Sequence, residues 1–246
     1  MRKPAVLVLL ATAMVHAQWK TPWAYNGPTG PEHWGDLDPE YAACKGRAQS
    51  PVDIRATVKE NLPLLAFQYK SAPLKYLINN GKTIRVNYHD ASGGDLFALG
   101  VRYHLTQFHF HRPAEDLVNG KQYEMVAHLM HESDDKKAAG VAVLIRAGHA
   151  NETVRKLWDH MSPAEGPERE IPGVEVTAAG LLPPEFAYYT YRGSLSAPPC
   201  TEDVVWFVLK TPIELSRQQI AAFAKLYPDD IRPVQPLNGR IIRESK

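Results

Sequence analysis

Residues 105–116 read LTQFHFHRPAED, and in this stretch His109 and His111 are separated by a single phenylalanine. Strict alternation of polar and apolar residues is typical of a half-buried β-strand. Because residues i and i+2 of a strand lie on the same face, both imidazoles are expected to project from one side of a sheet. The pattern fits two metal ligands or two half-buried packing side chains, and a third ligand is needed to choose between them.

A second strand-like run supplies a third histidine. Residues 119–120 are Asn-Gly and lie between the two runs, where this dipeptide favours a two-residue hairpin turn because both positions need positive φ. A regular hairpin with this loop places His111 opposite His128 and His109 opposite Met130. The three histidines would then converge on one face, which is the donor set of a catalytic Zn²⁺ ion whose fourth position is open.

Strand-like segments outnumber helical ones along the chain. We expect a mainly β (α+β) protein, a single domain around one large sheet with small peripheral helices. Ser216 is a candidate N-cap for the second helix, because its hydroxyl oxygen can accept from the first-turn N–H groups. The predicted strands span residues 64–69, 83–88, 103–111, 123–131, 141–147 and 204–209, and the predicted helices span 151–160 and 216–226.

The composition is typical of a soluble globular protein and argues against two classes of partner. Of the 246 residues, 22% are charged and 44% are hydrophobic, and the net charge is +1 at pH 7. This balance provides no overall field for nucleic acid or for an anionic membrane, so neither is expected as a partner. Length alone allows one large β-rich domain or two small ones, and no linker or repeat favours two.

The first 17 residues differ from the rest of the chain. A basic start is followed by an apolar run from Pro4 to Val15 and then by small residues, which is the pattern of a secretory signal peptide cleaved after Ala17. A membrane anchor is the alternative, but the run is too short to span a bilayer. We therefore expect a mature chain of residues 18–246 that is secreted or periplasmic.

The chain has two cysteines, Cys44 and Cys200. In the oxidising compartment that export implies, one disulfide is favoured over two free thiols. Closing a loop of this length would stabilise the fold by about 4–5 kcal/mol in the chain-entropy model. Metal ligation by the cysteines is the weaker interpretation, because neither belongs to a C-x-x-C pair.

Several motifs together resemble those of the α-class carbonic anhydrases, specifically the secreted bacterial type. They are QFHFH, AHLMH, YRGSLSAPPCTE and VVWFVLK, with AQSPVDI, INNG and RPVQPLN at the family's positions over essentially the whole mature chain. The resemblance implies a catalytic domain over residues 18–246 and a mostly antiparallel, twisted central sheet of about ten strands. It also implies that a zinc-bound hydroxide attacks CO₂, giving bicarbonate and a proton. Bacterial members pair cysteines at Cys44 and Cys200.

The resemblance also assigns roles to individual residues. His109, His111 and His128 would bind Zn²⁺, and Gln107 would accept a hydrogen bond from His109. The Ser196 hydroxyl, in place of the family's threonine, would act with Glu115 to orient the reacting group. The implied CO₂ pocket consists of Met130, Leu195, Ala197, Val204 and Trp206. Anions and sulfonamides are the expected inhibitors. Members of this type are often dimers, although no interface signature for a homodimer stands out in the sequence.

Two residues depart from the family pattern. Lys82 stands where fast members carry a proton-shuttle histidine. A lysine side chain ordinarily has a pKa near 10.4 and is a poor proton acceptor at pH 7, so we expect buffer and water to carry the proton. Val126 stands where members usually carry a glutamate that orients the third zinc ligand, and Glu124 lies two residues further away. Loss of such a partner can lower metal affinity or activity about 10–100-fold.

Two other functions compete with CO₂ hydration. The first is a catalytically silent binding module on the same fold, but such relatives typically lose a zinc histidine, and all three remain here. The second is an esterase, which we expect only as a side activity because the implied pocket residues are bulky and apolar.

Overall fold

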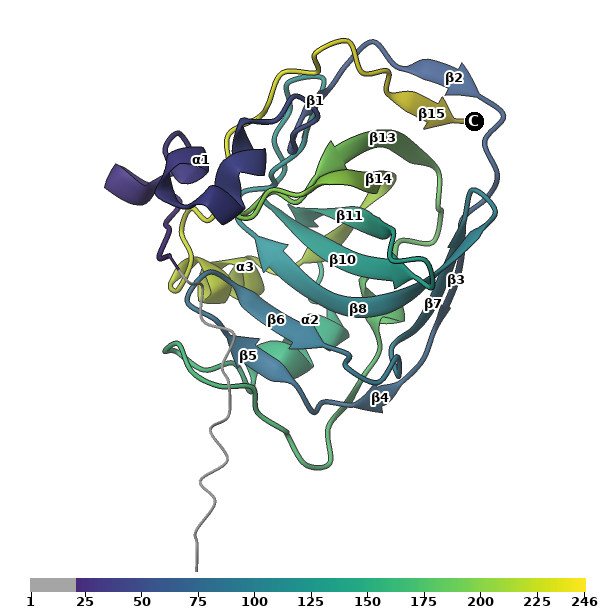
Figure 1. Cartoon of the computed structure of the whole chain (residues 1–246). Helices are drawn as coiled ribbons and strands as arrows, with labels where there is room; N and C mark the ends of the chain where they lie inside the picture. Colours follow the sequence, from purple (N-terminus) through teal and green to yellow (C-terminus); the bar gives the residue numbers. More distant parts are fainter. Residues whose placement is uncertain (1–20) are drawn as a thin grey trace, which may run out of the picture.

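One twisted sheet of eleven strands dominates residues 21–246, the part of the chain that the computed structural model describes (Figure 1). The expected signal peptide and its cleavage site after Ala17 lie outside these residues. Most neighbouring strands are antiparallel, but β11 pairs with β14, and β15 with β2, in parallel, so the sheet is mixed. The expected mainly β fold is confirmed.

The strand order across the sheet is β2 (Val58–Glu60), β15 (Arg243–Ser245), β13 (Tyr188–Ser194), β14 (Glu202–Leu215), β11 (Ala138–Ala147), β10 (Met125–Ser133), β8 (Val101–His111), β6 (Ile84–Asn87) and β5 (Leu77–Asn79). Outside this order, β7 (Gly94–Ala98) pairs with β8, and β3 (Ala66–Tyr69) pairs with β7.

Short elements surround this sheet. Two small ladders pair β1 (Asp53–Ile54) with β9 (Leu117–Val118), and β4 (Ala72–Pro73) with β12 (Glu175–Val176). The α-helices are α1 (Trp34–Leu37), α2 (Glu152–Trp158) and α3 (Arg217–Ala224), and 3₁₀ turns span Gly27–Thr29, Pro39–Lys45 and Ala178–Leu181. No helix within residues 21–246 has the length and apolar character needed to cross a membrane.

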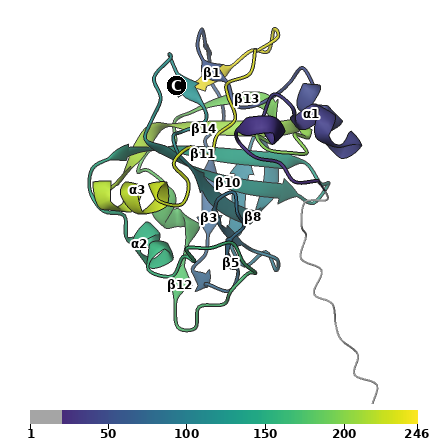
Figure 2. The same ribbon diagram turned by 90° about the vertical axis from the view of Figure 1, so that its left-hand side faces the viewer.

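Both predicted helices form, and each begins directly after a residue whose side chain caps its first turn. Asn151 Oδ1 accepts from the backbone N–H of Val154 at the start of α2, and Ser216 makes a reciprocal capping box with Gln219 at the start of α3. Both helices lie on one side of the sheet, opposite the side that carries α1 (Figure 2). Their buried residues join the main core with Phe108 of β8. That face of the sheet is therefore the packed core, and the other face is left for a site.

A β-bulge in β8 determines which residues face the core. Met130 of β10 pairs with Gln107, but its neighbour His131 pairs with Leu105, so Thr106 is the extra residue. The bulge changes the alternation, because Leu105 lies in the core before it and Phe108 after it. Gln107 and the histidines that follow are consequently turned away from the core.

The predicted register of the histidine hairpin is wrong by two residues. His109 pairs with His128 instead of Met130, and His111 pairs with Val126 instead of His128. The Asn-Gly turn does form, with positive φ at both positions, but it closes a separate turn between Val118 and Lys121. Residues 112–124 form a connection, and β9 within it pairs with β1, so the turn does not set the strand register. A slip of two residues preserves the face of every side chain, and the convergence of the histidines survives.

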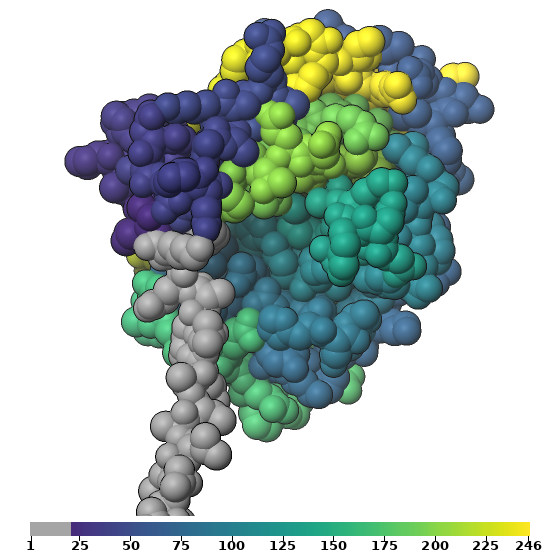
Figure 3. All heavy atoms as spheres, viewed as in Figure 1, coloured from purple at the N-terminus to yellow at the C-terminus, as the bar shows by residue number. Residues whose placement is uncertain are grey.

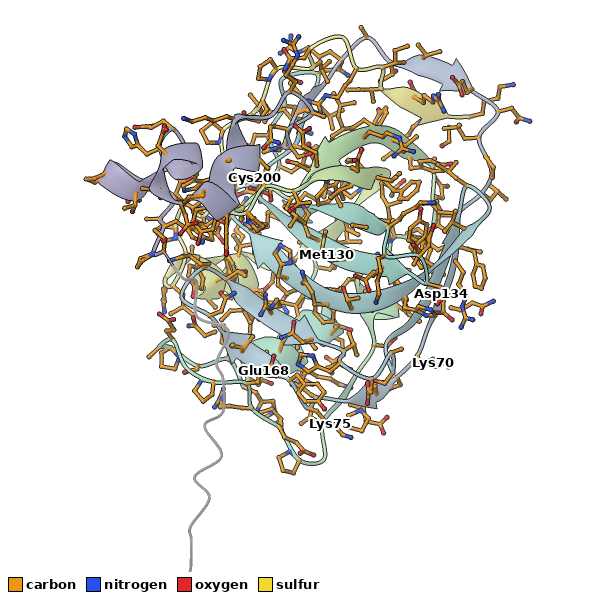
Figure 4. All side chains as sticks on the ribbon, in the orientation of Figure 1. Lys70, Lys75, Met130, Asp134, Glu168 and Cys200 are labelled. Atoms are coloured by element: carbon orange, nitrogen blue, oxygen red, sulfur yellow. A yellow bond between two sulfur atoms is a disulfide. The ribbon has the colours of Figure 1, made fainter. Side chains whose placement is uncertain are left out.

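The disulfide between Cys44 and Cys200 is present, and it joins positions 156 residues apart. Both cysteines belong to a small aromatic cluster with Trp23, Trp34 and Tyr41. The disulfide therefore fastens the N-terminal segment, which includes α1, to the loop between β13 and β14. Figure 4 shows Cys200 beside this segment, above the strands that carry the histidines.

Candidate metal centre

Three histidines from two adjacent strands meet on the open face of the sheet. His109 and His111 come from β8, and His128 comes from β10. Their ring centroids are 4.8–5.3 Å apart, and one nitrogen of each lies within 4.8 Å of the others. His111 and His128 are buried, and His109 is half-buried. This is the geometry of a metal site with all three ligands on neighbouring strands.

The second nitrogens of two rings are held by the protein. His109 Nδ1 donates to Gln107 Oε1 (2.8 Å), as expected. His111 Nδ1 donates to the backbone carbonyl of Asp230 (2.7 Å). Each bond fixes the ring orientation and, in the neutral imidazole, the tautomer, in which Nε2 is the nitrogen with a free lone pair. Two metal-binding nitrogens are thus prepared by their partners.

His128 differs from the other two histidines. Both of its ring nitrogens are buried, and neither has a hydrogen-bond partner among residues 21–246. Nδ1 lies 3.7 Å from Glu115 Oε2, which is too far for a hydrogen bond, and His111 Nε2 lies at the same distance from that oxygen. Val126 shares the face of His128 but offers it no acceptor. The ring is positioned by packing, with its centroid 4.8 Å from that of Trp206.

Burial lowers the pKa of all three rings, but the neighbouring charges lower it further at two of them and raise it at the third. Burial, followed by the charge of neighbouring histidines, holds the pKa values of His109 and His128 well below their ordinary value. Burial also lowers the pKa of His111, but the charge of Glu115 and the contacts with Asp230 outweigh it and raise this pKa to about 9. A metal ligand must be the neutral imidazole, so metal binding at this site would displace a proton from His111.

An apolar wall adjoins the histidines. Four of the five residues of the expected pocket share one cluster: Met130, Val204 and Trp206 are buried in it, and Leu195 packs against it. Ala197 packs instead against the N-terminal aromatic cluster. Met130 lies near the middle of the open face (Figure 4), and the surface there is hollowed beside the N-terminal segment (Figure 3). A small apolar molecule could lie against this wall within reach of the metal position.

Glu115 lies beside the histidines, 3.7 Å from His111 Nε2 and His128 Nδ1, and it is not joined to Ser196. Glu115 is buried, Oε1 accepts from the backbone N–H of Arg232 (3.0 Å), and Oε2 has no hydrogen-bond partner among the described residues. Ser196 is buried in the loop after β13, and within residues 21–246 no hydrogen bond links its hydroxyl to Glu115. The serine hydroxyl lacks the methyl group that would restrict its rotamer.

Lys82 lies in the turn before β6, with its Nζ 5.0 Å above the ring centroid of Trp23. The Trp23 ring contacts Tyr25, and Tyr25 contacts His111. The ammonium group therefore stands at the edge of the histidine site, where a cation–π contact holds it.

The sequence gives no signal for two residues of the site. Asp230 holds His111 through a backbone carbonyl, a contact for which residue type carries no signal. Arg85 lies opposite His109 in β6, where alternation with apolar neighbours predicts only a strand with one polar face. Pairing of β6 with β8 was the missing information.

Comparisons with known proteins agree with this geometry. The model of the eukaryotic-type carbonic anhydrase family matches residues 29–246. A protein of Nostoc sp. named carbonic anhydrase is 42% identical over 229 residues, covering 91% of this chain and 86% of that protein. A Klebsiella pneumoniae protein of the same name is 40% identical over 96% of each chain. The solved α-carbonic anhydrase of Thermovibrio ammonificans, in complex with sulfanilamide, matches with a TM-score of 0.86 at 41% identity, over 92% of this chain and 99% of that one.

Proposed function

The chain belongs to the eukaryotic-type carbonic anhydrase family and catalyses the reversible hydration of CO₂, and on this premise we propose that its metal is zinc, held by His109, His111 and His128. The donor set fits this ion, because three imidazole nitrogens with an open fourth position are the ligands of catalytic zinc sites. His111 and His128 have buried nitrogens without a hydrogen-bond partner within residues 21–246, and these support the proposal, since unpaired buried polar atoms are rare unless something binds them. Zinc in such a site is a Lewis acid that lowers the pKa of water from 15.7 to about 7.

The protein's own residues prepare the site for this ion and for CO₂. Gln107 and the Asp230 carbonyl fix two of the imidazoles, so that little reorganisation is needed when the metal arrives. Met130, Val204 and Trp206 form the apolar wall on which CO₂, an uncharged molecule, would lie. The wall also excludes water from one side of the reacting carbon.

We propose that Ser196 and Glu115 orient the attacking oxygen. The support is the burial of both residues, the position of Glu115 beside two of the histidines, and its Oε2, which has no hydrogen-bond partner within residues 21–246 and could accept from the serine hydroxyl. We further propose that buffer and water carry the released proton, because Lys82 is engaged with the Trp23 ring rather than positioned as a proton acceptor.

We propose export to the periplasm or to the cell exterior. The support is the disulfide between Cys44 and Cys200, since such bonds persist in oxidising compartments. Sulfonamides are proposed inhibitors, because the Thermovibrio ammonificans relative is solved with sulfanilamide. A homodimer stays a prediction, which sedimentation velocity would test.

Metal analysis combined with a CO₂ hydration assay tests the function. The purified protein should contain one zinc per chain and hydrate CO₂, and His109→Ala should lose both the metal and the activity. Bound zinc with negligible hydration would favour a binding module. Activity that survives both His109→Ala and chelation would refute the assignment of the site.

A further inference from the structure

Strand β6 places an arginine on the face of the sheet that carries the histidines. Arg85 lies directly opposite His109 in the β6–β8 pair. Opposed residues of antiparallel strands project to the same face, so the guanidinium group stands on the side of the metal centre. Its neighbours Ile84 and Val86 are buried in the core on the other face. The orientation of Arg85 is therefore fixed by the packing of the residues on either side.

Arg85 has no counter-ion in the part of the chain that the structure describes. No carboxylate of residues 21–246 forms an ion pair with it, and its Nε is buried without a hydrogen-bond partner. Burial lowers the pKa of Arg85, and only the charge of Glu168 opposes this. That carboxylate is already used, because it accepts from Asn87 Nδ2 (2.5 Å) and lies 3.0 Å from His89 Nε2 beside β6 (Figure 4). A half-buried guanidinium without a partner is costly, and a bound anion would offset that cost.

Lys82 supplies a second positive charge on the same side of the site. The Asn80 side chain accepts from the backbone N–H groups of Lys82 (3.0 Å) and Thr83 (2.9 Å), which fixes the turn before β6. The ammonium group rests on the Trp23 ring, at the edge of the histidine site. The polar side of the metal centre therefore carries two cations, while the opposite side is the apolar wall.

We propose that Arg85, assisted by Lys82, forms an oxyanion subsite beside the metal centre and that this subsite binds bicarbonate. The inference deepens the proposed function and rests on it. The guanidinium group presents N–H donors in a planar fork that matches two oxygens of a carboxylate-like anion, and bicarbonate is such an anion. The subsite holds the substrate of dehydration and makes hydration sensitive to its product. CO₂ is uncharged, so the two cations of the subsite do not strengthen its binding.

Nuclear magnetic resonance of the zinc-loaded, ¹⁵N-labelled protein tests binding without reference to activity. The Nε–H signal of Arg85 is assigned by its loss in Arg85→Lys. Added bicarbonate should shift this signal in a saturable way, and chloride at equal ionic strength, which has no pair of oxygens, should shift it little. No shift, or the same shift with both anions, would overturn the subsite even if the enzyme is fully active. A clear shift in an inactive protein would instead leave the subsite standing and refute CO₂ hydration.

Bicarbonate inhibition of CO₂ hydration gives the second readout. Arg85→Gln should raise the bicarbonate inhibition constant by roughly 10-fold, more than it changes KM for CO₂, and Arg85→Lys should raise it less because the charge is kept. Arg217→Gln, an exposed residue of α3, makes the same change in net charge and should leave the constant unchanged. Equal effects of Arg85→Gln and Arg217→Gln would mean that only net charge matters, and would contradict the subsite.

Discussion

Replacing Val126 by glutamate should slow the loss of zinc from the protein. Val126 lies two residues before His128 on the same strand, so the two side chains share a face. Neither nitrogen of His128 has a hydrogen-bond partner among the described residues, and the valine is fully buried. A carboxylate at residue 126 would give the ring N–H an acceptor and hold the imidazole in its ligating orientation.

The size of the effect follows from two opposing contributions. An outer hydrogen-bond partner changes metal affinity by about 10–100-fold, which corresponds to about 1.4–2.8 kcal/mol. Against this, Val126 belongs to an apolar cluster with Ala114 and Leu144, and a larger side chain there costs about 1–3 kcal/mol of folding free energy. We therefore expect Val126→Glu to lose zinc about 10–100-fold more slowly while its metal-free form unfolds more easily.

The assay follows transfer of zinc to an excess of a coloured chelator at fixed pH, in the wild type and three variants. Val126→Gln offers an acceptor without charge and should slow transfer less than Val126→Glu. Val126→Met matches both in size, has no acceptor of comparable strength and serves as the control for overpacking. If Met slows transfer as much as Glu, packing is responsible. If Glu has no effect, His128 is already held as firmly as the other ligands, and the reasoning is refuted.

Lys82→His should raise kcat at low buffer concentration, because an imidazole exchanges protons near neutral pH; stopped-flow hydration at increasing buffer concentration measures this, and a kcat that never depends on buffer would contradict it. Gly140→Ala should cost about 1–3 kcal/mol of folding free energy, because a Cβ would lie 2.5 Å from the Trp206 ring. Chemical denaturation measures that loss, with Gly166→Ala, whose Cβ would meet nothing within 4 Å, as the control. Hydrogen bonds from His104 to Asp134 and Asp95 raise its pKa, so its contribution to stability is complete below its ordinary pKa and is lost as pH rises through the raised value. Urea unfolding should show the advantage of the wild type over His104→Gln shrinking with pH, and a growing advantage would refute this.

The helices and most of the longer strands of this fold could be predicted because their signals are local, although β13, seven residues long, was not among the predicted strands. Asn151 and Ser216 cap their helices through their own side chains, and residues 103–111 alternate as a strand should. The bulge at Thr106 was not predictable, because it depends on how β10 lies against β8. The edge strand β2 and its neighbour β15 were not predicted either, since each is three residues long and is held by partners distant in sequence.

The candidate site likewise contains residues that the sequence predicts and residues that it does not. His109 and His111 follow from spacing, and His128 was found through a register that is wrong by two residues but keeps the correct face. The carbonyl of Asp230 and the guanidinium of Arg85 come from segments whose position only the tertiary structure fixes. The sequence thus identifies the ligands, whereas the groups that orient and surround them depend on long-range packing.

An anomalous-difference map at the zinc absorption edge, from crystals of the purified protein, tests the central assignment most directly. We expect one peak at about 2.0–2.1 Å from one nitrogen of each of His109, His111 and His128, with the Cys44–Cys200 disulfide uninvolved. A peak elsewhere, or one bound by His109 and His111 with His128 turned away, would contradict the three-histidine zinc centre.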